Sequence, residues 1–523
     1  MELDRQACYR VLLARDRRYD GRFFTCVTST GIYCRPICPA RTPKLENCVF
    51  VTSAAAAQEA GYRPCLRCRP ERSPDIVGTW GSSATVSRAL KLIERGALDG
   101  DDCEALAARL GVGARQLRRL FHQHVGASPI SVAQTRRVLL AKQLIHDSSL
   151  SMTQVASASG FSSLRRFNET FRALYGRPPS ALRRRSVPAR DTNSSLELFL
   201  PYRPPYDFPH LLAFLQARAI TGVEQVVEGR YERVIDVAGR PGALAVSNCA
   251  ERSALRVRVH LPDLAALPSV VARVRHLFDL GSDPRVIARE LGRDPLLAPL
   301  VATRPGLRVP GAWDAFEVAV RGIIGQQITV RAATKLLGEL VANLGSPLAR
   351  GPWEPGLSHA FPSPERFELA KLERLGMPRA RAAALHGVAR TLLSEPDLFE
   401  VGRSLEETVA RLVQLPGIGE WTAQYIAMRA LGQSDALPVG DIGLLRALAQ
   451  DGVRPTPKVL LARAEAWRPW RSYAVLHLWT EEAARAASKP PSAQPAERRA
   501  PRRRNESKRT KEERRVDVHA AAS

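Results

Sequence analysis

Apolar residues recur every three or four positions over two stretches of the chain, 101–126 and 151–182, which is the spacing of helices with one buried face. A glycine interrupts each stretch, Gly111 in the first and Gly160 in the second, and suits a tight turn between two helices. Ser162 is a candidate N-cap for the helix after the second turn. The pattern predicts two helix-turn-helix units. The positions expected to face inward are Leu106, Leu110, Val112, Leu117, Leu120 and Phe121 in the first unit and Leu164, Phe167, Phe171 and Leu174 in the second.

The polar face of the second helix in each unit is basic. It carries Arg115 and Arg118 in the first unit and Arg165 and Arg166 in the second. Such a face suits a DNA major groove, where arginine reaches guanine edges or phosphates. The alternative is a basic helix face that contacts only solvent. Two such helices occur within residues 84–185, which contain 17 basic and 7 acidic side chains, and this favours binding to DNA. The segment resembles the AraC-type regulator domain, which implies two recognition helices in successive major grooves.

A different helical pattern occupies residues 405–431. The amphipathic segment LEETVARLVQ leads into LPGIG and then into a second apolar stretch, which predicts helix, hairpin, helix. Leu415 opens the hairpin, and Gly417 and Gly419 would let backbone amides approach a DNA phosphate with no side chain between them. Alone, this helix-hairpin-helix pattern indicates DNA contact without sequence preference, and it does not indicate catalysis.

Asp441 follows the loop LPVG, 22 residues beyond Gly419. Its simplest role is the N-cap of a helix over 442–448, and a catalytic role is compatible with capping. The hairpin, the loop and the aspartate together resemble the helix-hairpin-helix DNA glycosylase superfamily. Residues 198–482 resemble its AlkA-type 3-methyladenine DNA glycosylases in particular. That resemblance implies that Asp441 is the catalytic carboxylate, and it implies a base pocket lined by Trp421, Tyr425, Trp479 and Phe214.

These residue types fit the implied chemistry. N-alkylated purines carry positive charge on the base, and electron-rich aromatic rings attract such a base by stacking and cation–π contact. A carboxylate would stabilise the positively charged sugar that forms as the base leaves, or position water. The alternative for the aromatic residues is simple packing in the core, which is their usual role on a helix.

The cysteines are concentrated at the start of the chain. Seven of the nine lie in the first 68 residues, and four of them form the pairs Cys34/Cys38 and Cys65/Cys68. Two closely spaced pairs joined by a loop suit a tetrahedral metal site, because each pair supplies two ligands. Reduced or disulfide-paired cysteines are the alternative. The remaining cysteines of this segment are expected to be small buried hydrophobic residues: Cys8, Cys26 and Cys48.

The segments VLLARDRRYDGRFFTCVTSTGIYCRPICPAR and YRPCLRCRPER resemble the N-terminal domain of the Ada adaptive-response family. The resemblance implies a zinc ion held by all four thiolates. It also implies that Cys34 takes a methyl group from a DNA phosphotriester. Methylation would make the cluster one charge less negative, which would favour binding to DNA.

Two absences and one departure from these families are informative. Glycosylases of this fold that also cut the DNA backbone carry a lysine two residues after the second hairpin glycine. Trp421 stands there, so we expect a monofunctional glycosylase without lyase activity. Gln327, in IIGQQITV, occupies the position where AlkA-type enzymes insert an apolar wedge, and its amide can still fill the gap left by a flipped base. No cysteine follows Cys249, which excludes an iron–sulfur cluster and the second methyltransferase of Ada proteins.

The composition of the chain indicates the kind of partner and the cellular compartment. Among 523 residues, 77 Lys and Arg against 52 Asp and Glu give a net charge of +25, which points to a polyanion partner. The chain has no apolar stretch long enough for a transmembrane helix and no signal peptide at its charged N-terminus. We therefore expect a protein of the bacterial cytoplasm, associated with the nucleoid and not with membranes.

The expected fold class is multidomain and mainly α with α+β parts. It comprises a zinc-bound four-cysteine domain (1–80), an AraC-type double helix-turn-helix (84–185), a small TATA-binding-protein-like α+β domain (195–305), an all-α helix-hairpin-helix glycosylase domain (306–488) and a disordered basic tail (489–523). The expected function is excision of alkylated bases, combined with methyl acceptance and activation of the adaptive response. Double-stranded DNA, both alkylated and promoter, and RNA polymerase are the expected partners of a monomer.

Two other functions remain open. The first is a transcription regulator with a catalytically inactive glycosylase-like body, against which Asp441 and its aromatic neighbours argue. The second is an AraC-type regulator that responds to a small metabolite. That function calls for a β-rich ligand domain before the helix-turn-helix, where this chain has its cysteine site.

Overall fold

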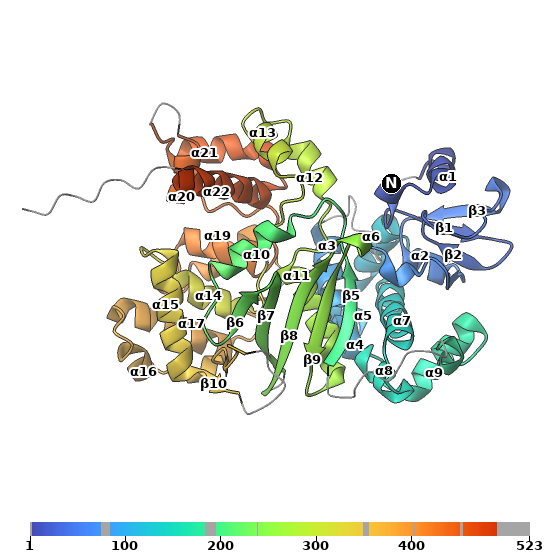
Figure 1. Ribbon diagram of the computed structural model, residues 1–523, viewed down its shortest axis with the longest axis horizontal. Coiled ribbons are helices and arrows are strands. Elements are labelled where there is room, and N and C mark those ends of the chain that lie inside the picture. The colour runs from blue at the N-terminus through green and yellow to red at the C-terminus, as the bar shows by residue number, and fades with distance from the viewer. Residues whose placement is uncertain are drawn as a thin grey trace, which may run out of the picture. The chain divides into compact units, whose positions relative to one another are not determined.

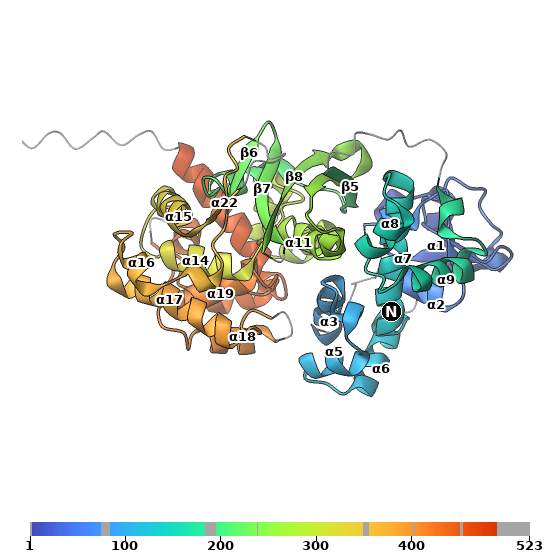
Figure 2. The same ribbon diagram turned by 90° about the horizontal axis from the view of Figure 1, so that it is seen from below.

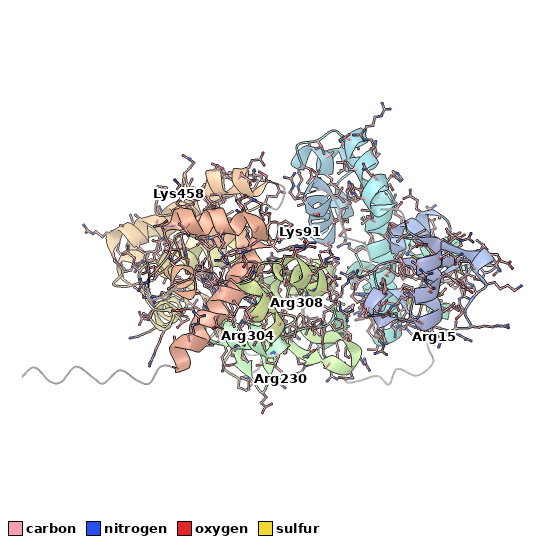
Figure 3. The ribbon with its side chains drawn as sticks, turned by 90° about the horizontal axis from the view of Figure 1, so that it is seen from above. Arg15, Lys91, Arg230, Arg304, Arg308 and Lys458 are labelled. Carbon is pink, nitrogen blue, oxygen red and sulfur yellow. The ribbon has the colours of Figure 1, made fainter. Side chains whose placement is uncertain are left out.

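The computed structural model describes residues 3–74, 84–183, 195–237, 239–348, 355–400, 403–449 and 453–488 (Figure 1). The predicted basic tail (489–523) lies outside these ranges. Within them, no helix has the length and apolar character needed to cross a membrane. Basic side chains come from every domain, as the labelled Arg15, Lys91, Arg230, Arg304, Arg308 and Lys458 show (Figure 3).

The N-terminal domain is built on a four-stranded sheet in the order β3-β1-β2-β4. Strand β1 pairs antiparallel with β2 and β3, and β2 pairs parallel with β4. Phe24, Cys26 and Tyr33 are fully buried under helix α2. The elements are α1 (Arg5–Ala14), β1 (Phe24–Val27), β2 (Ile32–Cys34), β3 (Cys48–Val51), α2 (Ala54–Glu59) and β4 (Arg63–Pro64), with 3-10 turns at Arg17–Tyr19, Leu45–Asn47 and Pro70–Arg72.

Seven helices form the next domain, and both predicted turns are present in it. Gly111 and Gly160 have φ angles of +68° and +82°, a backbone conformation that favours glycine. Helix α7 joins the bundle of α3 to α6 to the bundle of α8 and α9 (Figures 1 and 2). The helices are α3 (Ala84–Glu94), α4 (Ala97–Gly100), α5 (Cys103–Arg109), α6 (Ala114–Val125), α7 (Pro129–Asp147), α8 (Met152–Ala158) and α9 (Leu164–Tyr175).

Two details of the second unit differ from the prediction. Ser163, rather than Ser162, caps helix α9, because its hydroxyl accepts the Arg166 N–H. The prediction that Leu164 faces inward is wrong. As the first residue of α9, Leu164 is 40% exposed, whereas Phe167 and Phe171 are fully buried.

A five-stranded antiparallel sheet in the order β5-β9-β8-β7-β6 forms the third domain. From Leu255 onward the residues of β9 alternate: Leu255, Val257 and Val259 are buried, while Arg256 and Arg258 are exposed. The buried face therefore packs on helices α10 and α11, as an α+β domain requires. The elements are β5 (Ser195–Pro201), α10 (Phe208–Gln216), β6 (Glu224–Val227), β7 (Arg230–Val237), β8 (Arg240–Cys249), β9 (Ala254–His260) and α11 (Leu267–Leu277).

The last domain is almost entirely helical. Helices α14 and α19 lie side by side at its centre (Figures 1 and 2), where Gly322 lets them approach. A Cβ at Gly322 would stand 3.1 Å from the Thr422 methyl group. The helices are α12 (Pro284–Leu291), α13 (Leu297–Thr303), α14 (Ala315–Ile324), α15 (Val330–Leu344), α16 (Leu369–Glu373), α17 (Arg379–Ser394), α18 (Leu405–Leu412), α19 (Glu420–Arg429), α20 (Ile442–Ala447), α21 (Pro457–Ala464) and α22 (Arg471–Ser488), with a short pair of strands, β10 (Ser346–Pro347) and β11 (His359–Ala360).

Candidate functional sites

The four predicted cysteines meet at one point of the N-terminal domain. The sulfur atoms of Cys34, Cys38, Cys65 and Cys68 all lie within 4.8 Å of one another. Strand β2 ends at Cys34, and the turn after β4 carries the second pair. Cys34 is half-buried, whereas the other three are 5–7% exposed. Of these four residues, Cys34 is therefore the most exposed.

Backbone groups support these sulfurs as metal ligands. The Arg35 N–H lies 3.4 Å from the Cys68 sulfur, and the Arg67 N–H lies 3.4 Å from the Cys65 sulfur. N–H donors stabilise thiolates, and four thiolates at this spacing fit the tetrahedral coordination of zinc.

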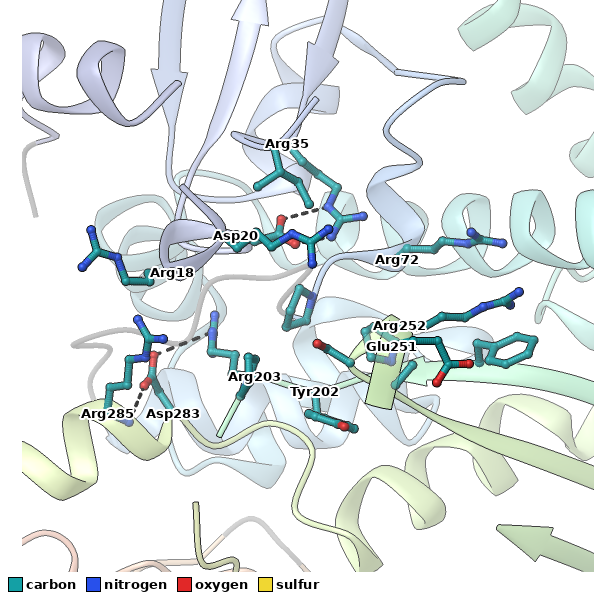
Figure 4. Close-up of a pocket in the computed structure, with 18 residues that line it drawn as sticks. Arg18, Asp20, Arg35, Arg72, Tyr202, Arg203, Glu251, Arg252, Asp283 and Arg285 are labelled. Carbon is teal, nitrogen blue, oxygen red and sulfur yellow. Dashed lines mark hydrogen bonds and ion pairs between the residues drawn. The ribbon is translucent and has the colours of Figure 1, made fainter. Parts of the chain in front are cut away.

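Arg35 ties this site to the rest of its domain. Its guanidinium pairs with Asp20 and donates to the Cys68 carbonyl at 3.1 Å (Figure 4). The side chain therefore links the backbone at Cys68 to the carboxylate of Asp20. The predicted small cysteines Cys8, Cys26 and Cys48 are buried and lie outside the cluster, as expected.

The predicted DNA-reading arginines lie on exposed helix faces. Arg115 and Arg118 are exposed on α6, and Arg165 and Arg166 are exposed on α9. Arg118 pairs with Glu104 and Arg165 with Glu169, both at 2.8 Å. Exposed pairs of this kind contribute little stability, so both arginines can exchange the carboxylate for a DNA phosphate.

Three N–H groups converge on the carboxylate of Asp441. Its Oδ1 accepts from the Trp479 indole at 2.9 Å and from the Leu444 backbone at 2.9 Å, while Oδ2 accepts from the Trp421 indole at 3.0 Å. Asp441 is thus the N-cap of α20, as predicted, and it also joins two aromatic residues from α19 and α22. The arrangement holds the carboxylate in one orientation.

The aromatic residues of the predicted pocket are connected through arginines. The rings of Trp421 and Tyr425 stack at 5.3 Å between centroids with a 6° interplanar angle. Arg429 donates to the Tyr425 hydroxyl at 2.7 Å and lies 4.7 Å from the Phe214 ring centre. Arg218 covers the same Phe214 ring at 3.7 Å. The structure therefore brings Phe214 into this group, although α10 is distant from α19 in the sequence.

These guanidiniums also set the electrostatics of the pocket. Burial raises the pKa of Tyr425, but the positive charges of Arg429, Arg218 and Arg321 outweigh it and leave this pKa below its usual value. Sequence reasoning missed Arg218 and Arg429. The available signal was their spacing. Arg429 stands four residues after Tyr425 on α19 and so shares its face, and Arg218 stands four residues after Phe214, just beyond the end of α10.

The predicted DNA-contacting loops are exposed. Gly417 has a φ angle of +83°, and a Cβ there would lie 2.3 Å from that of Ala384. Gly419 has a φ angle of −84°, and a Cβ there would meet no atom within 4 Å. Gln327 is exposed at a φ angle of +60°, a strained conformation for a residue other than glycine. Leu415, at the start of the hairpin, is half-buried.

A cavity of about 300 Å³ is lined by residues of the first and third domains, many of them arginines (Figure 4). Part of its positive charge is compensated within the protein, because Arg35 pairs with Asp20 and Arg203 lies 3.7 Å from Asp283.

Four family models match successive parts of the chain. The metal binding domain of Ada matches residues 7–71 and a helix-turn-helix domain matches 106–185. The AlkA N-terminal domain matches 197–314, and the helix-hairpin-helix superfamily of base excision DNA repair proteins matches 320–472. Fold and sites together thus define a DNA repair glycosylase joined to an Ada-type metal-binding domain and a DNA-binding regulator domain.

A relative that is similar along almost the whole chain identifies one family within this class of proteins. A Mycobacterium tuberculosis protein, "Probable bifunctional transcriptional activator/DNA repair enzyme AlkA", is 38% identical over 92% of this chain and 97% of its own length. The chain belongs to this family of bifunctional activator and repair proteins. Two Escherichia coli proteins match its parts. DNA-3-methyladenine glycosylase 2 is 35% identical over 54% of this chain and 96% of its own length, and the bifunctional activator and repair enzyme Ada is 36% identical over 25% and 35%.

Proposed function

We propose that the protein excises alkylated bases such as 3-methyladenine from double-stranded DNA by hydrolysis, with Asp441 as the catalytic carboxylate. The observation that carries this proposal is the convergence of the Trp421 and Trp479 indole N–H groups on Asp441. Hydrogen bonds to both oxygens fix the direction in which the carboxylate points. A fixed negative charge stabilises the positive sugar that develops as the base departs.

The aromatic group next to Asp441 would receive the flipped base. Tyr425, Trp421, Trp479 and Phe214 supply ring surface, and a base with positive charge is attracted to such rings. Trp421 provides no amine for attack on the sugar, so water is the nucleophile and the DNA backbone stays intact. Gln327 would fill the gap in the base stack, and the hairpin at Leu415, Gly417 and Gly419 would hold the backbone.

We further propose that Cys34 accepts a methyl group from a DNA methylphosphotriester. The sulfur attacks the methyl carbon, an S–C bond forms, the C–O bond breaks, and a phosphodiester anion leaves. Zinc bound by Cys34, Cys38, Cys65 and Cys68 would keep the sulfurs as thiolates at neutral pH. The greater exposure of Cys34 supports its role as the acceptor.

Loss of one negative charge from the cluster would lower its repulsion from DNA phosphates. The methylated protein would then bind promoter DNA through Arg115 and Arg118 on α6 and Arg165 and Arg166 on α9. We propose that it acts there as a monomer and recruits RNA polymerase, at the nucleoid in the bacterial cytoplasm.

The first test replaces Asp441 by asparagine and follows base release from alkylated duplex DNA under single-turnover conditions. The carboxylate acts on charge that develops in the transition state, so Asp441→Asn should slow release by about 100-fold or more. Glu406→Gln, which neutralises an exposed carboxylate on α18, should leave the rate unchanged. No release by a folded wild type that still binds DNA would leave a regulator with an inactive glycosylase body.

The second test maps methyl transfer by mass spectrometry after incubation with DNA that carries methylphosphotriesters. One added methyl group should appear on the peptide that contains Cys34 and on no other cysteine. The Cys34→Ser variant should gain none. A methyl group on Cys38, Cys65 or Cys68 in the wild type would show that exposure does not select the acceptor.

A further inference from the structure

The loop between α14 and α15 carries an exposed residue in a strained conformation. Gln327 has a φ angle of +60°. Its neighbour Ile328 is 36% exposed. A left-handed conformation at a residue other than glycine persists only where surrounding contacts determine it. The preceding residue, Gln326, makes hydrogen bonds to the hairpin, to α19 and to α17.

The side chain of Gln326 bridges two other parts of the site. Its amide nitrogen donates to the carbonyl of Gly417 at 2.8 Å and to the hydroxyl oxygen of Thr422 at 3.1 Å. Gly417 belongs to the hairpin, and Thr422 lies on α19 between Trp421 and Tyr425. The Gln326 amide group therefore links the loop that carries Gln327, the hairpin, and α19, the helix that carries Trp421 and Tyr425 of the proposed base pocket.

Helix α17 contacts both the loop that carries Gln327 and the hairpin. Arg381 donates to the backbone carbonyl of Gln326 at 2.8 Å. Ala384, one turn further along α17, stands where a Cβ at Gly417 would fall. The loop that carries Gln327 therefore contacts the hairpin directly, and both of them contact α17. These contacts fix the distance between Gln327 and the hairpin.

We propose that Gln326 is a positioning residue that holds Gln327 in register with the hairpin, so that the wedge enters the duplex opposite the base pocket. This inference rests on the proposed function, in which Gln327 fills the gap left by the flipped base. Gln326 itself touches neither the base nor the sugar. Its effect on base release should therefore pass through Gln327.

A double-mutant cycle tests this dependence. The variants are Gln326→Leu, Gln327→Ala and the double variant, and the readout is single-turnover release of an alkylated base. We expect each single change to slow release by about 10-fold or more. The double variant should be no slower than the slower single variant, because both changes remove one function. Effects that multiply would overturn the proposal.

A second substrate separates positioning from chemistry and from a loss of folding. Placing the alkylated base opposite a mismatch lowers the work of flipping it out. The defects of Gln326→Leu and Arg381→Ala should shrink on this substrate, whereas that of Asp441→Asn should persist. Gln216→Leu, the same change at an exposed site on α10, is the matched control. A Gln326→Leu defect equal on both substrates would overturn the proposal, and absent release by the wild type would instead overturn the proposed function.

Discussion

At Asp441 three N–H donors occupy both carboxylate oxygens, and two of them are indoles from different helices. An N-cap aspartate needs only the backbone donor, here Leu444. Capping therefore does not require the two indole hydrogen bonds. They fix the plane of the carboxylate and place its charge beside the stacked rings of Trp421 and Tyr425.

The Trp479→Phe substitution removes one of these donors and keeps an aromatic ring. A hydrogen bond to a charged group contributes about 1.5–3 kcal/mol. If that contribution acts in the transition state, base release should slow by about 10- to 100-fold. Single-turnover kinetics on alkylated duplex DNA measures the rate.

The matched control is Trp470→Phe, at an indole that packs against Tyr473 rather than Asp441. It should leave the rate within about threefold of the wild type, within the small range expected of changes away from the site. Equal rates for Trp479→Phe and Trp470→Phe would show that the indole N–H is dispensable and that Trp479 serves only as ring surface.

At the scale of elements, the hairpin between α18 and α19 contains two glycines with different physical roles. Gly417 needs its left-handed backbone and the space beside Ala384, so it serves the fold. Gly419 has an ordinary φ angle and open space around it, so nothing within the described protein requires glycine there. Approach of a DNA backbone does provide a reason.

Alanine at each position separates these roles. Gly417→Ala combines a left-handed residue with a steric clash and should lower the free energy of unfolding by about 2–4 kcal/mol. Gly419→Ala should change that free energy by less than about 1 kcal/mol but weaken binding to undamaged duplex DNA at fixed salt. Thermal unfolding and a DNA titration measure the two effects. Unchanged DNA affinity in Gly419→Ala would mean that this glycine does not face a phosphate.

The elements themselves could be predicted from the sequence, because helical periodicity and turn glycines are local signals. Gly111, Gly160 and the cap at Asp441 all stand where the pattern placed them. The contact of Arg429 with Phe214 could not be predicted, because it exists only where α19 and α10 meet in space. The cap of α9 shifted from Ser162 to Ser163 because two adjacent serines offer the same chemistry, and local pattern does not separate them.

At the scale of the whole molecule, buried charges join the sheet domain to the helical domain. Glu317 on α14 pairs with Arg233 on β7 at 2.8 Å and with Arg321 at 2.7 Å. Arg321 also pairs with Glu224 on β6. Glu317 and Arg233 are 3% and 2% exposed. Loss of one member would leave its partners buried without compensation, so this network makes the two domains depend on each other for stability.

The Glu317→Gln substitution tests that dependence. Removal of one partner from a buried ion pair costs about 3–5 kcal/mol, so the free energy of unfolding at pH 7 should fall by that amount. Glu290→Gln, which breaks a more exposed pair with Arg293, should cost about 1 kcal/mol at most. Equal costs for the two variants in urea unfolding would show that the buried network does not join the domains.

The pH dependence of the free energy of unfolding, compared between wild type and Glu317→Gln, tests the same ion pair independently. Burial raises the pKa of Glu317, but Arg233 and Arg321 outweigh it and lower the pKa to about 2, below the usual 4.5. A carboxylate whose pKa is lowered by folding stabilises the fold above its unfolded pKa, and this contribution is lost as the pH falls through its folded pKa. The stability gap between wild type and Glu317→Gln should therefore be full above pH 4.5 and narrow as the pH falls toward 2. A gap that stays constant over this range would mean that the ionisation of Glu317 does not supply this stability.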